Sequence, residues 1–95
     1  MAVKIIIVRN VAPDKEEQIR PLLMQMRSGA HAQPGYVSGE TLVNYDDPRE
    51  KVVISTWKNL ENWNEWLRNP ERCELQGRVD EILGQETLYQ VYFSS

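Results

Sequence analysis

The sequence is poor in the residues that build disulfides and metal centres. It has one cysteine, Cys73, and one histidine, His31, among 95 residues. A single cysteine excludes an intramolecular disulfide and a cysteine-rich metal site, and it suits a reducing compartment. His31 stands among alanine and glycine, with no further histidine, cysteine or paired carboxylates at ligand spacing. We therefore expect no metal and interpret His31 as a surface residue.

Long apolar runs and clusters of like charge are also missing. The opening residues "MAVKIIIV" are too short for a signal peptide, and no apolar run approaches the length of a membrane span. The net charge of -3 and scattered lysines and arginines argue against a nucleic-acid surface. There is no glycine-rich phosphate loop. The sequence predicts a cytoplasmic protein without nucleic-acid or membrane partners.

Apolar periodicity and turn residues predict four strands and three helices in one domain spanning residues 1–95. The strands are expected at 3–11, 36–45, 51–57 and 87–93. Helices are expected after Asp14, which with Glu17 would form a capping box, after Asn59, and from Pro70 to Gly84. The order β-α-β-β-α-α-β is the split βαβ, ferredoxin-like pattern. It predicts an α+β fold with a four-stranded antiparallel sheet and helices on one face.

The strands predict a partner for the sheet. Residues 5–8 and 52–54 are apolar at every position, so both faces of these strands should be buried. Helices on one face leave the other face uncovered. Because most soluble oligomers are symmetric homo-oligomers, we predict a homodimer that packs sheet to sheet.

All three tryptophans fall within ten positions, in "STWKNLENWNEWL". Trp57 ends a strand, whereas Trp63 and Trp66 share one side of a helix. Periodicity alone favours a core role for Trp63. Three large rings between one helix and one sheet are hard to pack without a cavity, and apolar clefts with few polar groups bind small molecules. We interpret Trp57 and Trp66 as cleft residues.

Residues 33–71 resemble the antibiotic biosynthesis monooxygenase (ABM) domain. The resemblance is carried by Pro34-Gly35-Tyr36, an acidic turn, Trp57 at a strand end and Trp66 on the following helix. It implies a dimeric α/β barrel. Known activities of the family are cofactor-independent oxygenation of anthrones and quinols, and oxidative haem degradation. In the former the substrate activates O₂ itself, while the pocket orients it, stabilises an oxyanion and excludes water.

We hypothesise a monooxygenase that acts on a small aromatic or quinol-type substrate without a cofactor. The expected site residues are Trp66, Asn44 and Arg72 as the catalytic group, with Trp57, Tyr36 and Trp63 as the substrate-binding group. Tyr36 and Asn44 would supply hydrogen bonds, and Arg72 would stabilise an oxyanion.

Two departures from the family pattern keep other interpretations open. The offsets of the haem-degrading branch fall on Ile7, Trp66 and Gln76, and neither isoleucine nor glutamine is an ordinary axial haem ligand. Many family members carry Pro-Glu-His after the second helix, where this chain has Pro70-Glu71-Arg72. A general base is missing there. The alternative is therefore a non-catalytic dimeric barrel that binds a small hydrophobic ligand, with haem degradation a weaker third interpretation.

Overall fold

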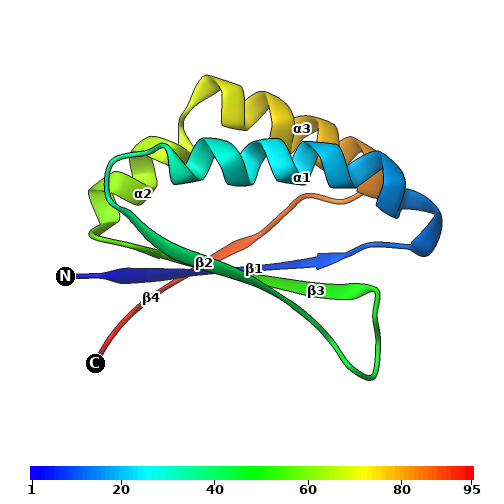
Figure 1. The fold of residues 1–95 in the computed structure, drawn as a ribbon, viewed down its shortest axis with the longest axis horizontal. Helices are drawn as coiled ribbons and strands as arrows, with labels where there is room; N and C mark the ends of the chain where they lie inside the picture. Colours follow the sequence, from blue (N-terminus) through cyan, green and yellow to red (C-terminus); the bar gives the residue numbers. More distant parts are fainter.

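Helices cover one face of a four-stranded antiparallel sheet in a computed structural model that describes residues 1–95 (Figure 1). The elements are β1 (Val3–Asn10), the 3₁₀ helix η1 (Pro13–Lys15), α1 (Glu16–His31), β2 (Tyr36–Val43), β3 (Glu50–Trp57), α2 (Leu60–Leu67), α3 (Pro70–Leu83) and β4 (Tyr89–Phe93). The strand order is β2-β3-β1-β4. The predicted α+β, ferredoxin-like fold is confirmed.

The first helix begins differently from the prediction. Pro13 starts a 3₁₀ turn, α1 follows from Glu16, and the residue at its N-cap is Lys15, without a side-chain capping bond. An N-cap side chain accepts a bond from the first turn while its own backbone is extended. Asp14 lies inside the 3₁₀ turn and does not cap the helix. The predicted Asp14 capping box is wrong.

The other helix ends follow the sequence signals. The Asn59 side chain accepts a hydrogen bond from the Asn62 backbone N–H at 2.9 Å and caps α2. Pro70 begins α3, and Gly84 ends it in the left-handed conformation with φ 72°. No helix combines the length and the apolar character needed to cross a membrane.

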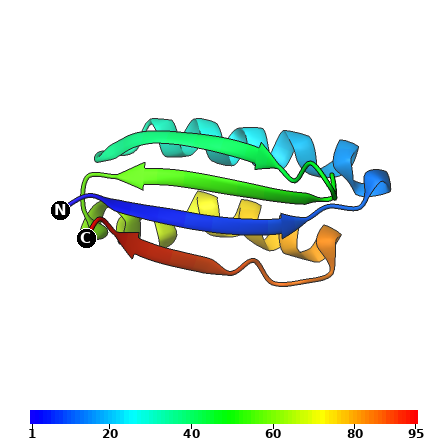
Figure 2. The same cartoon turned by 90° about the horizontal axis from the view of Figure 1, so that it is seen from below.

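Side chains alternate strictly along β1. Val3, Ile5 and Ile7 are buried beneath the helices, while Ile6 and Val8 lie on the opposite face. Seen from below, that second face carries no helix (Figure 2). We call it the open face. The pairing register places Val8 beside Val52, and Val52 beside Leu42, so an apolar row crosses it. Within the single chain, only one face of the central strands is covered.

Candidate functional site

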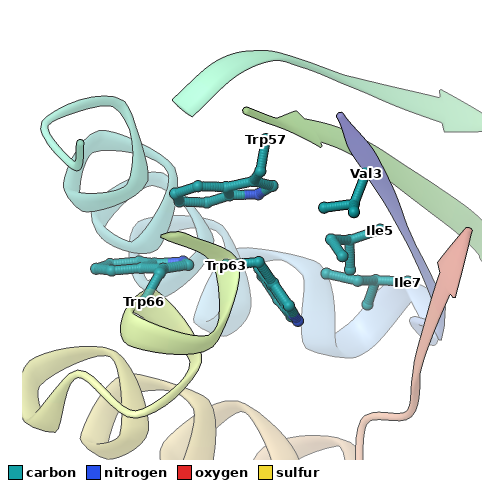
Figure 3. Packing of buried hydrophobic residues seen from close by; sticks show 6 residues of the cluster. All are labelled: Val3, Ile5, Ile7, Trp57, Trp63 and Trp66. Atoms are coloured by element: carbon teal, nitrogen blue, oxygen red, sulfur yellow. The ribbon is translucent and has the colours of Figure 1, made fainter. Parts of the chain in front are cut away.

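The three tryptophans form one buried cluster at one end of the helix layer. Trp57 comes from the end of β3, and Trp63 and Trp66 come from α2. They pack with the β1 residues Val3, Ile5 and Ile7, whose side chains project toward the helix layer (Figure 3). The ring centroids of Trp57 and Trp63 are 5.8 Å apart at an interplanar angle of 61°, an edge-to-face arrangement. All three rings are therefore core residues.

The absence of a side chain at Gly29 leaves room for the Trp66 ring. A Cβ at Gly29 would lie 2.8 Å from Cη2 of Trp66, closer than side-chain atoms normally approach. The close approach explains why glycine stands inside α1, which continues to His31. α1 is thereby held against the tryptophan cluster.

A cavity of about 430 Å³ lies between the helices and the sheet. Its walls include all three tryptophans together with Tyr36, and most lining residues are apolar. Pockets for small molecules range from about 300 to 1,000 Å³. Met24 of α1 and Thr41 of β2 also line the cavity and are exposed, which places the opening at the α1–β2 edge. The size fits a flat molecule of a few fused rings.

A polar network closes the cavity on the β1–β4 side, across the sheet from the opening. Its members are Arg9, Arg72, Gln76, Asp80, Thr87 and Tyr89. The side chain of Gln76 connects Arg9 and Tyr89 to Asp80 and Thr87. Its Oε1 accepts from Arg9 Nη2 and from Tyr89 Oη, each at 3.1 Å. Its Nε2 donates to Asp80 Oδ1 and to Thr87 Oγ1, each at 2.7 Å. The inner end of the cavity is rigidly hydrogen-bonded.

Arg72 is fixed from two sides. Nη1 donates to the Leu67 carbonyl oxygen at 3.0 Å, and Nη2 donates to the Tyr89 hydroxyl. Its guanidinium lies 5.0 Å from the centroid of the Tyr89 ring and 6.0 Å from that of Trp63, within range of cation–π attraction. Trp63 thus links the apolar wall to a held positive charge.

Burial shifts the pKa values of two groups in this network. It lowers the pKa of Arg9 from its ordinary value, because desolvation disfavours the charged form. It raises the pKa of Tyr89 above the ordinary value of about 10, and the positive charge of Arg72 opposes that shift. The Tyr89 hydroxyl is therefore protonated at neutral pH and remains a hydrogen-bond donor.

The structure brings together five of the six residues that the sequence singled out. Trp57, Trp63, Trp66, Tyr36 and Arg72 all line the cavity. The predicted division between a core Trp63 and cleft residues Trp57 and Trp66 disappears, because each ring is both buried and part of the wall.

Asn44 is placed elsewhere. It lies in the hairpin turn between β2 and β3 and is not among the lining residues. Its Oδ1 accepts from the backbone N–H groups of Asp46 at 2.8 Å and Asp47 at 3.2 Å. Asn44 organises the turn, and we give it no part in the site.

Three polar residues at the inner end of the cavity wall were not among the site residues predicted from the sequence. Arg9, Gln76 and Tyr89 all line the cavity. A signal for Arg9 was present, since it lies in phase with Ile5 and Ile7 on β1 and must share their buried face. Gln76 stands four residues after Arg72, on the same side of α3. Tyr89 had no comparable signal.

His31 lies at the rim. Its ring centroid is 4.6 Å from that of Tyr36, and its Nε2 is 3.5 Å from the Tyr36 hydroxyl. Neither histidine nor cysteine lines the cavity, and no group of three or more histidine, cysteine or acidic side chains is placed to hold a metal ion. Ile7, Trp66 and Gln76, the offsets of the haem-degrading branch, all line the cavity, but they add no haem ligand.

Comparisons with known proteins agree with this architecture. The family model described as "antibiotic biosynthesis monooxygenase" matches residues 2–77. A conserved protein from Methanosarcina mazei Go1 superposes with a TM-score of 0.91 at 17% identity, over 100% of this chain and 94% of that one. For the protein Rv0793 from Mycobacterium tuberculosis the TM-score is 0.86 at 21% identity, with 100% and 96% covered.

SnoaB, a cofactor-independent oxygenase from Streptomyces nogalater, is similar as well. Its TM-score is 0.76 at 15% identity, over 99% of this chain and 93% of that one. At these identities the structural likeness concerns the fold alone. No curated protein matches the sequence.

Proposed function

This chain belongs to the antibiotic biosynthesis monooxygenase family, and from that premise we propose that it is a cofactor-independent oxidoreductase that oxygenates a small aromatic, quinol-type substrate in its central cavity. The observation that carries the proposal is the combination of a tryptophan-walled cavity with a held cation and a neutral tyrosine hydroxyl at its inner end. Such a site can orient a flat molecule, exclude water from it and stabilise negative charge that develops on its oxygen.

The reaction needs no external reductant. When a ring methylene of an anthrone reacts with O₂, the products are a ring carbonyl and water, so the substrate supplies all four electrons. The substrate must first lose a proton, which passes to water at the cavity opening, to become electron-rich enough to react with O₂. The guanidinium of Arg72 is the group in the cavity wall that we assign to the resulting oxyanion, because a fixed positive charge stabilises it without reorganisation. Trp57 and Trp66 hold the ring system, and Tyr36 lies at the rim.

Oxygen uptake tests the proposal. Purified protein without added cofactor should consume O₂ with anthrones or hydroquinones faster than the buffer reaction. Trp66→Phe should lower the rate on the order of 10- to 100-fold, because the smaller ring no longer fills the space beside Gly29 and the substrate loses its alignment.

The control for this experiment is Leu60→Ala, on the exposed side of the same helix, which should leave uptake unchanged. Binding of these compounds without any uptake above the buffer rate would contradict the oxygenase assignment. That result would support the alternative, a non-catalytic barrel that binds a small hydrophobic ligand.

We also propose that the open face is covered by a second copy of the chain. Its apolar row of Leu42, Val52 and Val8 lies on the central and edge strands, and Val8 is 50% exposed in the single chain. Monomeric proteins rarely expose contiguous apolar patches of this kind. A symmetric dimer buries the same row from both chains at once.

Val8→Glu should dissociate this dimer. The carboxylate would be buried against apolar side chains of the partner at a cost of several kcal/mol, whereas in the monomer it would face water. Analytical ultracentrifugation should give twice the chain mass of 11.1 kDa for the natural sequence and the chain mass for Val8→Glu. Leu88→Glu, an exposed apolar position outside the sheet, should leave the dimer intact. A natural sequence that sediments as a monomer would refute the dimer.

A further inference from the structure

The inner end of the cavity holds more positive charge than its own residues neutralise. Arg9 and Arg72 are only 7% and 5% exposed. The single carboxylate of the network, Asp80, accepts from Gln76 and from the backbone and hydroxyl groups of Thr87. The ion pairs of the chain are Glu16 with Arg20 and with Lys51, so neither buried arginine has one. Buried charges are normally paired, which makes this surplus unusual.

Arg9 is the less satisfied of the two guanidiniums. Arg72 donates to two protein oxygens, whereas Arg9 donates from Nη2 to Gln76 alone. The Nε atom of Arg9 is buried and has no hydrogen-bond partner. A buried donor without a partner costs about as much as a lost hydrogen bond, and each such group calls for an explanation. Because Arg9 also lines the cavity, its guanidinium can donate to a bound ligand as well as to Gln76.

The rest of the cavity lining also carries an excess of positive charge. Five cationic side chains and two acidic ones line the cavity, although the chain as a whole carries a net charge of -3. Of the two acidic residues, Glu16 is engaged by Lys51 at 3.0 Å. Glu40 is exposed, and its pairing with Ile54, which pairs with Ile6, places its side chain on the open face of the sheet. The cavity is thus a positive pocket in an acidic protein, and its field favours entry of an anion.

We propose that Arg9 forms an anion subsite for a carboxylate carried by the aromatic ligand. A carboxylate is ionised at neutral pH without help from the protein, and its two oxygens match the planar array of guanidinium donors. With the acid group held at Arg9, the ring system lies against the apolar wall of the cavity. The proposal deepens the proposed function, since it names the ligand class of the same cavity. Arg72 keeps its separate assignment to the oxyanion formed during reaction.

Equilibrium binding tests the subsite without requiring turnover. The probes are 2-naphthoate and its neutral amide, which have the same shape and differ in charge. Isothermal titration calorimetry should show the carboxylate bound about 10- to 100-fold more tightly than the amide, the range expected for charge-assisted hydrogen bonds. Arg9→Met should reduce this preference to less than about 3-fold and leave the affinity for the amide nearly unchanged.

The Arg9→Met variant is expected to fold. Methionine fills much of the same volume, the substitution removes a buried charge that has no ion pair, and Gln76 Oε1 still accepts from Tyr89. Arg9→Lys provides a second variant, because it keeps the charge but loses the planar donors, and its preference should fall between the two. Arg20→Met, at an exposed position of the lining, is the comparison for the general field of the cavity, and it should lower the preference much less than Arg9→Met does.

The subsite would be overturned if the natural sequence bound the carboxylate no more tightly than the amide, or bound neither at the highest soluble concentration. An undiminished preference in folded Arg9→Met would also overturn it. So would an equal loss of preference in Arg20→Met, because that result would assign the preference to the general field of the cavity. Failure of oxygen uptake would leave these binding results standing, so the two proposals can fail separately.

Discussion

Replacing Arg72 with methionine should lower kcat for oxygen uptake about 10²- to 10³-fold, the usual effect of removing one group that stabilises an oxyanion. The effect is expected because the guanidinium of Arg72 is fixed in place at the cavity wall. Arg72 is the guanidinium held on both sides, by the Leu67 carbonyl and the Tyr89 hydroxyl, and it contacts the face of the aromatic wall. Oxygen-electrode assays over a range of substrate concentrations should show the loss mainly in kcat, because the interaction is stronger in the transition state than in the bound substrate.

Arg72→Lys and Arg68→Met separate catalysis from structure. Lysine keeps a charge in the cavity but cannot donate to both Leu67 and Tyr89 in one plane, so it should recover only part of the rate. Arg68 is exposed at the end of α2, and its replacement should change nothing. An Arg72→Met variant that is folded and retains full kcat would remove Arg72 from the mechanism.

Trp57→Ala should lower the free energy of unfolding by about 3–5 kcal/mol, the range measured for large aromatic side chains deleted from cores. Trp57 is 1% exposed, packs edge-to-face against Trp63 and donates from its indole nitrogen to Ser55. Because small proteins are stable by only about 5–15 kcal/mol, this loss removes a large part of the total. Urea unfolding followed by circular dichroism, at one protein concentration throughout, gives the value.

Tyr45→Ala is the comparison for that measurement. Tyr45 is an aromatic residue in the hairpin turn that is 97% exposed, so its deletion should change stability by less than about 0.5 kcal/mol. A Trp57→Ala effect as small as that of Tyr45→Ala would mean that the tryptophan cluster does not hold the helices on the sheet.

The fold was predictable because its signals are local. Short apolar, β-branched runs in the strands, helical spacing of apolar residues, the Asn59 cap and the Pro70 and Gly84 boundaries each specify an element from nearby residues. The start of α1 was not predictable in the same way. Asp14 and Glu17 have the spacing of a capping box, but Pro13 allows a 3₁₀ turn that competes with it, and the sequence gives no measure of which wins.

The residues of the candidate site also differ in whether nearby sequence could predict them. The tryptophans and Arg72 are found from sequence because they lie on or beside the family's motif positions. The polar end of the cavity depends on side chains from β1, α3 and β4, which only the tertiary fold brings together. Asn44 shows the opposite error, since a polar residue next to a strand served the turn and not the cavity. Chain neighbours predict turns well, but they do not predict which distant side chains share a pocket.

The most direct test of the central claim is isotopic labelling with ¹⁸O₂. The purified protein, dialysed against a chelator and given an anthrone as its only reductant, should form the quinone with one ¹⁸O atom per molecule and consume one O₂ for each substrate oxidised. Mass spectrometry of the product measures the incorporation, and the rate should exceed the buffer reaction. Product formed no faster than in buffer, or quinone without ¹⁸O, would contradict the assignment of the cavity to a cofactor-independent monooxygenase.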